Sequence, residues 1–397
     1  MSHTHGPAPV ASRRTRRIVT AVLAPAALAT LIAMIVLWPG RVRLDAGPDP
    51  GTRALGTVTA VAERTCPDGK VCGKATVRIT EGPGTGTEAI VDLPQGPGAV
   101  RLAAGDYVVL LHQAGDPAYV VVDHQRGGSM TWLVGLAALV VLAFGRKSGL
   151  TALIGLAISF AVLLLFVIPA LLAGSPPLLV AVVGASAIMF AALYLTHGVS
   201  VQTSVAIAGT LASLALTGLL GVAFTGLLDL TGVATDDDAF LAATRDGLDM
   251  RGLLLAGVVI GALGVLDDVT VTQAATVGEL AAAGPASRLE LYRAAGRIGR
   301  AHVASAVNTI VLAYAGASLP LLLLLATGTQ PVSQLLTGEV LAQEILRSAV
   351  GTIGLVASVP ITTALAALVA EPGQAIRTRS AGRHSSRRDR WRPPRWW

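Results

Sequence analysis

Residues 252–280 read GLLLAGVVIGALGVLDDVTVTQAATVGEL, an apolar run that contains two adjacent carboxylates, Asp267 and Asp268. The run is long enough to cross ~30 Å of hydrocarbon as a helix, which takes about 20 apolar residues. An acid inside such a segment costs about 2.5–3.5 kcal/mol on insertion scales, so it is a candidate functional residue. The stretch therefore predicts a transmembrane helix that carries an ionisable site.

The composition of the whole chain indicates a polytopic membrane protein. Of its 397 residues, 53% are hydrophobic and only 14% are charged, against about 25% charged residues in soluble domains. The mean hydropathy is +0.65. This composition excludes a cytosolic enzyme, a nucleic-acid-binding domain, a disordered regulator and a disulfide scaffold. The lipid bilayer is the expected partner, and no nucleic acid is expected.

Apolar stretches predict an all-α bundle of about eight transmembrane helices. The first stretch, 18–38, follows a basic segment, 1–17, and is longer than the ~7–15-residue apolar core of a signal peptide. We expect an uncleaved anchor, and a cleaved signal peptide is the alternative. Seven further spans divide a membrane domain that covers 129–370. They are 129–145, 150–174, 178–195, 201–228, 252–271, 303–327 and 345–370.

Basic residues predict how these helices are oriented. Eighteen Arg and Lys residues lie at segment ends that fall on one side of the membrane if both termini are cytoplasmic, whereas the opposite short loops hold Arg245, Arg251 and Arg347. The positive-inside rule then predicts a multi-pass protein of a bacterial inner membrane with cytoplasmic N- and C-termini. The basic tail, 371–397, either lies on anionic lipid or is a solvated, disordered segment.

The segment 39–128 predicts a small extracytoplasmic all-β domain. Hydrophobic and polar residues alternate with period 2 in five short runs separated by Gly- and Pro-rich turns. This pattern favours a small barrel or sandwich, with an OB-like barrel as one candidate. The five runs are 57–63, 74–81, 88–93, 107–112 and 119–123.

The two cysteines, Cys66 and Cys72, lie in this segment. We expect them to form a disulfide because the extracytoplasmic compartment is oxidising. Their spacing is not C-x-x-C, which argues against a redox pair. Two cysteines also cannot build a four-thiolate metal site.

Polar residues on the sixth span form one stripe. Asp268, Thr272, Thr276 and Glu279 recur at helical spacing, with Thr270 and Gln273 to the side, and we expect the stripe to face the bundle interior or a water-filled path. The seventh span brings Asn308 and Tyr314 to a comparable depth. The predicted proton or cation site consists of Asp268, Asn308, Asp267, Thr272, Glu279 and Tyr314. In the alternative interpretation Asp268 is structural, bonding between helices or pairing with an arginine near the cytoplasmic surface.

No catalytic motif accompanies these residues. The sequence contains no Gly-x-Ser-x-Gly, no His-Glu-x-x-His and no Walker loop. We therefore expect no enzyme activity, no cofactor and no metal site.

Three blocks of sequence resemble the YibE/F-like family of bacterial membrane proteins, over roughly 129–370. The blocks begin at Gly261 (GALGVLDDVTVTQA), at Asn308 (NTIVLAYAGASLP) and at Gly351 (GTIGLV, followed by VPIT). The resemblance implies a multi-pass protein with an extracytoplasmic N-terminal domain, and it implies no particular activity. The family pattern has one acid, which corresponds to Asp268, so Asp267 is a departure from it.

These observations predict an integral inner-membrane protein that acts as a transporter or permease of a small solute or ion, with Asp268 as a proton or cation site. The alternative is a non-transporting envelope scaffold or assembly factor. It would act through the β domain, with an envelope protein or a second copy of the chain as its partner.

Overall fold

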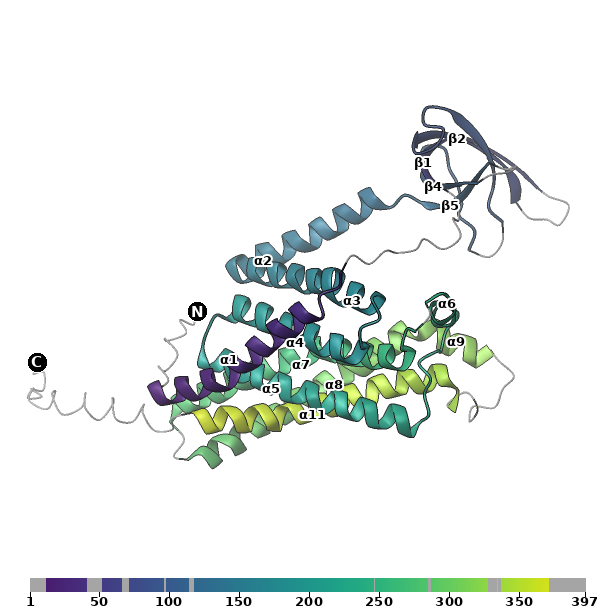
Figure 1. The fold of residues 1–397 in the computed structure, drawn as a ribbon. Helices are drawn as coiled ribbons and strands as arrows, with labels where there is room; N and C mark the ends of the chain where they lie inside the picture. The colour runs from purple at the N-terminus through teal and green to yellow at the C-terminus, as the bar shows by residue number, and fades with distance from the viewer. Residues whose placement is uncertain are drawn as a thin grey trace, which may run out of the picture. The chain divides into compact units, whose positions relative to one another are not determined.

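The computed structural model describes residues 12–40, 52–65, 71–95, 98–113, 118–245, 247–284, 287–327, 334 and 337–370. The chain divides into two compact units, one formed by Arg43–Leu150 and the other by Met1–Val42 together with Thr151–Trp397. The first unit contains the sheet and the second contains a helical bundle (Figure 1).

The β unit is one antiparallel sheet in which the strand order is β3-β2-β1-β4-β5. The five strands match the five predicted runs, and β4 has the predicted bounds. Alternate side chains point inward and form a core that includes Val58, Val77 and Leu110. The strands are β1 (Thr52–Thr65), β2 (Val71–Glu81), β3 (Glu88–Asp92), β4 (Tyr107–His112) and β5 (Tyr119–His124).

Helix α2 (Gly127–Val162) carries the chain from one unit into the other. It is interrupted at Arg146, whose backbone is non-helical with φ 51° and ψ −123°. The interruption lies between the predicted spans 129–145 and 150–174, so the sequence placed this break correctly. The chain continues through η1 (Leu163–Val167) and α3 (Ile168–Leu172).

Helices α5, α7 and α11 pack against one another and form the centre of the bundle. Helix α4 packs on α7, α8 packs on α11 and α7, and α1 packs on α4 and α5 (Figure 1). The bundle contains α1 (Arg13–Val36), α4 (Pro177–His197), α5 (Val201–Leu227), α6 (Asp236–Thr244), α7 (Met250–Ala283), α8 (Arg288–Ala317), α9 (Leu319–Thr327) and α11 (Glu339–Val369).

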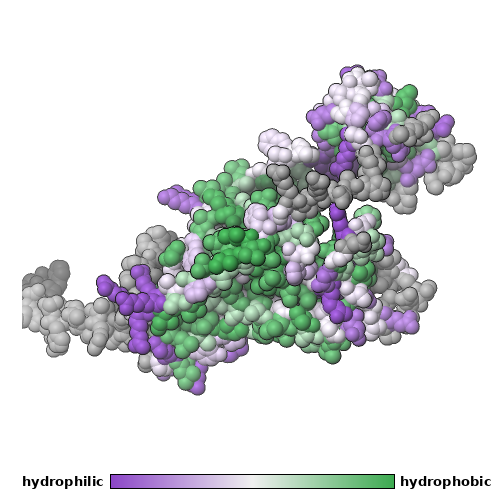
Figure 2. Space-filling model, viewed as in Figure 1, coloured by the Kyte–Doolittle hydropathy of each residue, from purple (hydrophilic) through white to green (hydrophobic). Residues whose placement is uncertain are grey.

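Six helices of the described chain are long and apolar enough to cross a membrane: α1, α2 with its continuation to Leu172, α4, α5, α7 and α11. The face of the bundle that Figure 2 shows is accordingly mostly hydrophobic. The predicted count of about eight transmembrane helices exceeds these six for two reasons. The spans 129–145 and 150–174 count as one helix, and the span 303–327 is divided at Ser318 between α8 and α9. Proline follows at position 320, and proline cannot supply the backbone N–H that a continuous helix needs.

Two glycines allow α5 and α11 to approach closely. A Cβ at Gly209 on α5 would collide with the Thr362 hydroxyl, and a Cβ at Gly354 on α11 would collide with the Thr217 hydroxyl. Thr217 and Thr362 are fully buried. Membrane helices associate through small residues of this kind, because lipid gives no hydrophobic drive for helix–helix contact.

We expect Gly354→Ala to lower the free energy of unfolding by about 1–3 kcal/mol, the usual cost of overpacking a core. Gly351→Ala is the matched control on the same helix, because a Cβ at Gly351 meets no atom within 4 Å. Thermal unfolding of both variants in detergent measures the difference. Equal midpoints for the two variants would contradict this account of the α5–α11 contact.

Candidate functional site

The buried face of α7 is polar. Thr270 and Gln273 are almost fully buried, at 0% and 3% exposure. The hydroxyl oxygens of Thr270 and Thr210 on α5 are 2.7 Å apart. The Gln273 amide donates to the Thr363 hydroxyl on α11 at 2.7 Å and to the backbone carbonyl of Ala295 on α8 at 3.1 Å. This face therefore joins four helices by hydrogen bonds.

Asp267 lies beside this face, near the middle of α7. The residue is half-buried. Its Oδ1 atom is buried and has no hydrogen-bond partner within the described part of the chain. Buried polar atoms are nearly always bonded to protein or to ordered water, so an unpartnered carboxylate oxygen marks a position where water or a cation would bind favourably.

The predicted polar stripe faces outward, so the expectation that it faces the bundle interior is wrong. Asp268, Thr272 and Glu279 are exposed, and Thr276 is half-buried. The physical reason is that Thr270 and Gln273, which the sequence put to the side, find partners on α5, α8 and α11. Asp268, Thr272 and Glu279 point about 100° or more away from Thr270 and Gln273, as the helical repeat requires.

Asn308 and Tyr314 are placed differently from each other on α8. Asn308 is exposed, and no hydrogen bond joins it to Asp268 within the described chain. Tyr314 is half-buried, and its hydroxyl would lie 3.2 Å from a Cβ at Gly261. It lines a small cavity of about 20 Å³, room for about one water molecule. The cavity is lined by Gly261, Ala262, Val265, Leu266, Ile310, Tyr314, Gly351 and Leu355.

A larger polar pocket of about 130 Å³ lies where α4 ends and α5 begins. Val271 forms its α7 wall, one helical turn from Asp267 on the same side of the helix. Hydroxyl, amide and imidazole side chains supply the other walls, so the pocket can hold water. Its lining residues are His197, Ser200, Gln202, Thr203, Ala206 and Val271.

Sequence reasoning missed two acids at the start of α11. One oxygen of Glu339 accepts hydrogen bonds from the backbone N–H groups of Thr231 and Gly232, from the Thr231 hydroxyl and from the Gln343 amide, at 2.6–3.1 Å. Glu344 pairs with Arg347 at 3.0 Å. Glu339 anchors a loop more than 100 residues away in sequence, and no local pattern signals such a contact.

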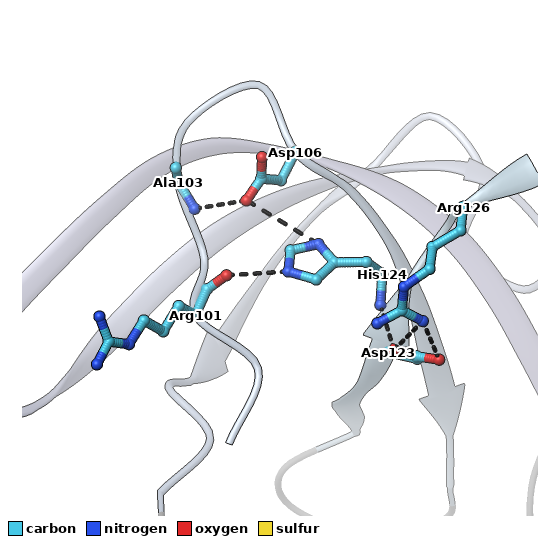
Figure 3. Close-up of polar contacts among 6 residues, drawn as sticks. All are labelled: Arg101, Ala103, Asp106, Asp123, His124 and Arg126. Atoms are coloured by element: carbon cyan, nitrogen blue, oxygen red, sulfur yellow. Dashed lines mark hydrogen bonds and ion pairs between the residues drawn. The ribbon is translucent and has the colours of Figure 1, made fainter. Parts of the chain in front are cut away.

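A second polar cluster lies in the β unit, at the end of β5 and just before α2 begins (Figure 3). The His124 ring is 3.0 Å from the Arg101 carbonyl and 4.0 Å from the Asp106 carboxylate. The Arg126 guanidinium donates to both oxygens of Asp123 at 2.7 Å, which holds the pKa of Asp123 below its usual range. The side chains of Asp106, Asp123, His124 and Arg126 are all at least 30% exposed. We therefore interpret the cluster as contacts that hold the loop before β4 in place rather than as a reactive site.

Only one of the two cysteines of the predicted disulfide lies within the described residues. Cys72, on β2, is disulfide-bonded. Cys66 lies outside the described residues, so the pairing of Cys66 with Cys72 stays a prediction. In the parts of the chain that the structure describes, no group of three or more His, Cys, Asp or Glu side chains is arranged to hold a metal ion.

Comparison with known proteins places the bundle in a family. The sequence model of the YibE/F-like protein family matches residues 133–372, which is more than half of the chain and includes Asp267, Asp268 and Asn308. No curated protein and no solved structure matches the chain. The matched segment runs from the first part of α2 through α11, and we conclude that the chain belongs to the YibE/F-like protein family.

Proposed function

We propose that this protein is a permease of a bacterial inner membrane that moves a small solute or ion, with Asp267 as the carboxylate that binds a proton or cation. The observation that carries the proposal is the buried Oδ1 atom of Asp267, which has no partner among the described residues. Ionisable residues within membrane spans mark ion pathways and proton relays, because a carboxylate there is costly unless it has a role.

The surroundings of Asp267 support an aqueous route to it. The 130 Å³ polar pocket lies one helical turn away along α7. With both termini cytoplasmic, as the arginine distribution favours, this pocket opens toward the cytoplasm. On the opposite end, Glu344 and Arg347 form an ion pair within α11, which can act as the polar boundary of the route.

The proposal moves the central role from Asp268 to Asp267. Asp268 is exposed on the outer face of the bundle, away from the buried polar face of α7, and it is not among the residues that line the pocket. The two acids follow one another in sequence, yet they point about 100° apart on the helix. They therefore have different surroundings and are expected to have different roles.

We expect Asp267→Asn to abolish function while leaving the protein in the membrane, because Asn keeps the size of the side chain and cannot exchange a proton. The measurement compares the deletion strain, the wild type, Asp267→Asn and Asp268→Asn on a broad panel of nutrients and stresses. Membrane abundance is measured in each strain.

Asp268→Asn, at the adjacent residue, is the matched control variant, and we expect it to retain most of the wild-type phenotype. A wild-type phenotype for Asp267→Asn would overturn the proposal. A fall in the abundance of Asp267→Asn would also count against it, since the carboxylate would then be structural.

A second candidate function is that of an envelope scaffold that binds a partner through the β unit. The outer face of β4 and β5 exposes Tyr107, Val120 and Val122, at 61%, 39% and 55% exposure, and Val109 and Leu111 lie beside them. Contiguous exposed apolar patches often mark interaction sites. The order β3-β2-β1-β4-β5, with β3 in contact with β5, supports an OB-like barrel for this unit.

If the scaffold function holds, Val122→Lys abolishes function at normal abundance and Asp267→Asn is tolerated, because a lysine cannot be desolvated in an apolar interface. Ala60→Lys, also on an exposed strand position, is the control and should be silent. The same phenotype panel reads all three variants. A silent Val122→Lys would rule out this surface as the functional one.

A further inference from the structure

We propose that the outward face of α8 binds the phosphate group of an anionic phospholipid, and that Arg293, Arg297 and Arg300 hold the headgroup. We call these three residues the arginine row. The inference concerns lipid at the surface of the bundle, so it depends neither on the permease function nor on Asp267.

The arginine row lies on the side of α8 that faces away from the bundle. Its three residues recur at i, i+4 and i+7, which places them on one side of a helix, and all three are exposed. The packed side is marked by Leu291, Ala295 and Gly299, which are buried. The helical repeat puts the centre of the packed side roughly opposite the row. The three guanidinium groups therefore point outward.

The guanidinium groups of the arginine row are unpaired within the described part of the chain. No ion pair or hydrogen bond joins them to another described residue, whereas the arginine side chains that have such partners lie elsewhere, at Arg78, Arg126, Arg251 and Arg347. Residues 288–302 contain four arginines and one acid, Glu290. The first part of α8 thus carries excess positive charge that an anion can neutralise.

Contacts of Gln273 give the level of the arginine row along the bundle. The Gln273 amide donates to the Ala295 carbonyl, and its side-chain oxygen would lie 2.7 Å from a Cβ at Gly299. Arg297 lies midway between these two positions on α8, so it is level with Gln273. The other two arginines lie within about 6 Å of that level, at 1.5 Å per residue.

This level is close to one end of the bundle. Gln273 also donates to Thr363, six residues before α11 ends at Val369. Val271, two residues before Gln273, lines the polar pocket together with His197, the last residue of α4. Helix ends mark the border of the hydrocarbon, because they leave backbone groups that lipid tails cannot satisfy. The arginine row therefore lies at this border, where the phosphates of phospholipids lie.

Toward the middle of the span, small and apolar residues continue the same side of α8. Ala304, Val307 and Val311 follow Arg300 at i+4, i+7 and i+11. Ala304 is exposed, Val307 is half-buried and Val311 is 44% exposed. Asn308 adds one polar group at the edge of this side. An acyl chain can therefore lie along the helix while its phosphate meets the guanidinium groups.

This combination favours a phospholipid over a soluble anion or an acidic protein. A guanidinium binds a phosphate through two parallel hydrogen bonds, and basic residues beside a span attract anionic headgroups. A soluble partner would match the arginine row alone, whereas a phospholipid also covers the apolar residues that continue it. The row is thus a site for a lipid of net negative charge, such as phosphatidylglycerol.

Photo-cross-linking of the full-length chain tests the proposal. The protein is reconstituted in phosphatidylcholine vesicles that contain a trace of phosphatidylglycerol or of phosphatidylcholine with a photoactivatable group in its acyl chain. After illumination, mass spectrometry identifies the cross-linked segment. The variants are Arg297→Gln and Arg293→Gln. Arg288→Gln is the matched control, because it removes the same charge from an exposed position on the same helix that lies off the arginine row.

We expect phosphatidylglycerol to cross-link to residues 301–312 at least fivefold more than phosphatidylcholine does. Arg297→Gln or Arg293→Gln should lower this yield about fivefold, the effect of one basic residue beside an anionic surface, and Arg288→Gln should leave it unchanged. Equal yields for the two lipids would overturn the proposal, as would an equal loss in Arg288→Gln. A larger loss in sodium phosphate than in sodium chloride of equal ionic strength would also overturn it, since the row would then bind free phosphate.

Discussion

The side-chain amide of Gln273 holds the centre of the bundle together. It is nearly fully buried and donates to α8 through the Ala295 carbonyl and to α11 through the Thr363 hydroxyl. A Cβ at Gly299 would lie 2.7 Å from its oxygen, so α8 approaches closely only because that residue is glycine. In a membrane interior no water replaces such bonds. The rotation of α7 about its own axis is therefore set by the partners of Gln273 and Thr270.

That rotation determines what the two adjacent acids can do. With Gln273 facing α8 and α11 and Thr270 facing α5, Asp267 lies at the edge of the packed face and Asp268 lies on the outside. The Asp267 carboxylate then has a buried oxygen without a partner among the described residues, one helical turn from Val271, which lines a polar pocket. The Asp268 carboxylate belongs to the exposed stripe with Thr272 and Glu279. A rotation of about 100° around α7 thus separates the candidate transport site from the exposed stripe.

Most of the fold could be predicted from the sequence because the signals are local. Period-2 alternation placed all five strands, and Arg146 interrupts α2 where the sequence changes from apolar to basic. The family resemblance on three blocks is confirmed by the family match. Which polar face of α7 points inward could not be predicted, because Thr270 with Gln273 and Asp268 with Thr272 both recur at a spacing that places them on one side of a helix. The choice depends on Thr210 and Thr363, which are 60 and 90 residues away from their partners.

The central claim is that Oδ1 of Asp267, which has no partner among the described residues, is a binding position. The most direct test is a high-resolution structure of the full chain in a lipid nanodisc, read at the Asp267 carboxylate. The account predicts an ordered water or cation within about 2.3–3.2 Å of Oδ1, the range of cation–oxygen and hydrogen-bond distances. A protein donor bonded to Oδ1, or a carboxylate turned toward the lipid, would contradict it.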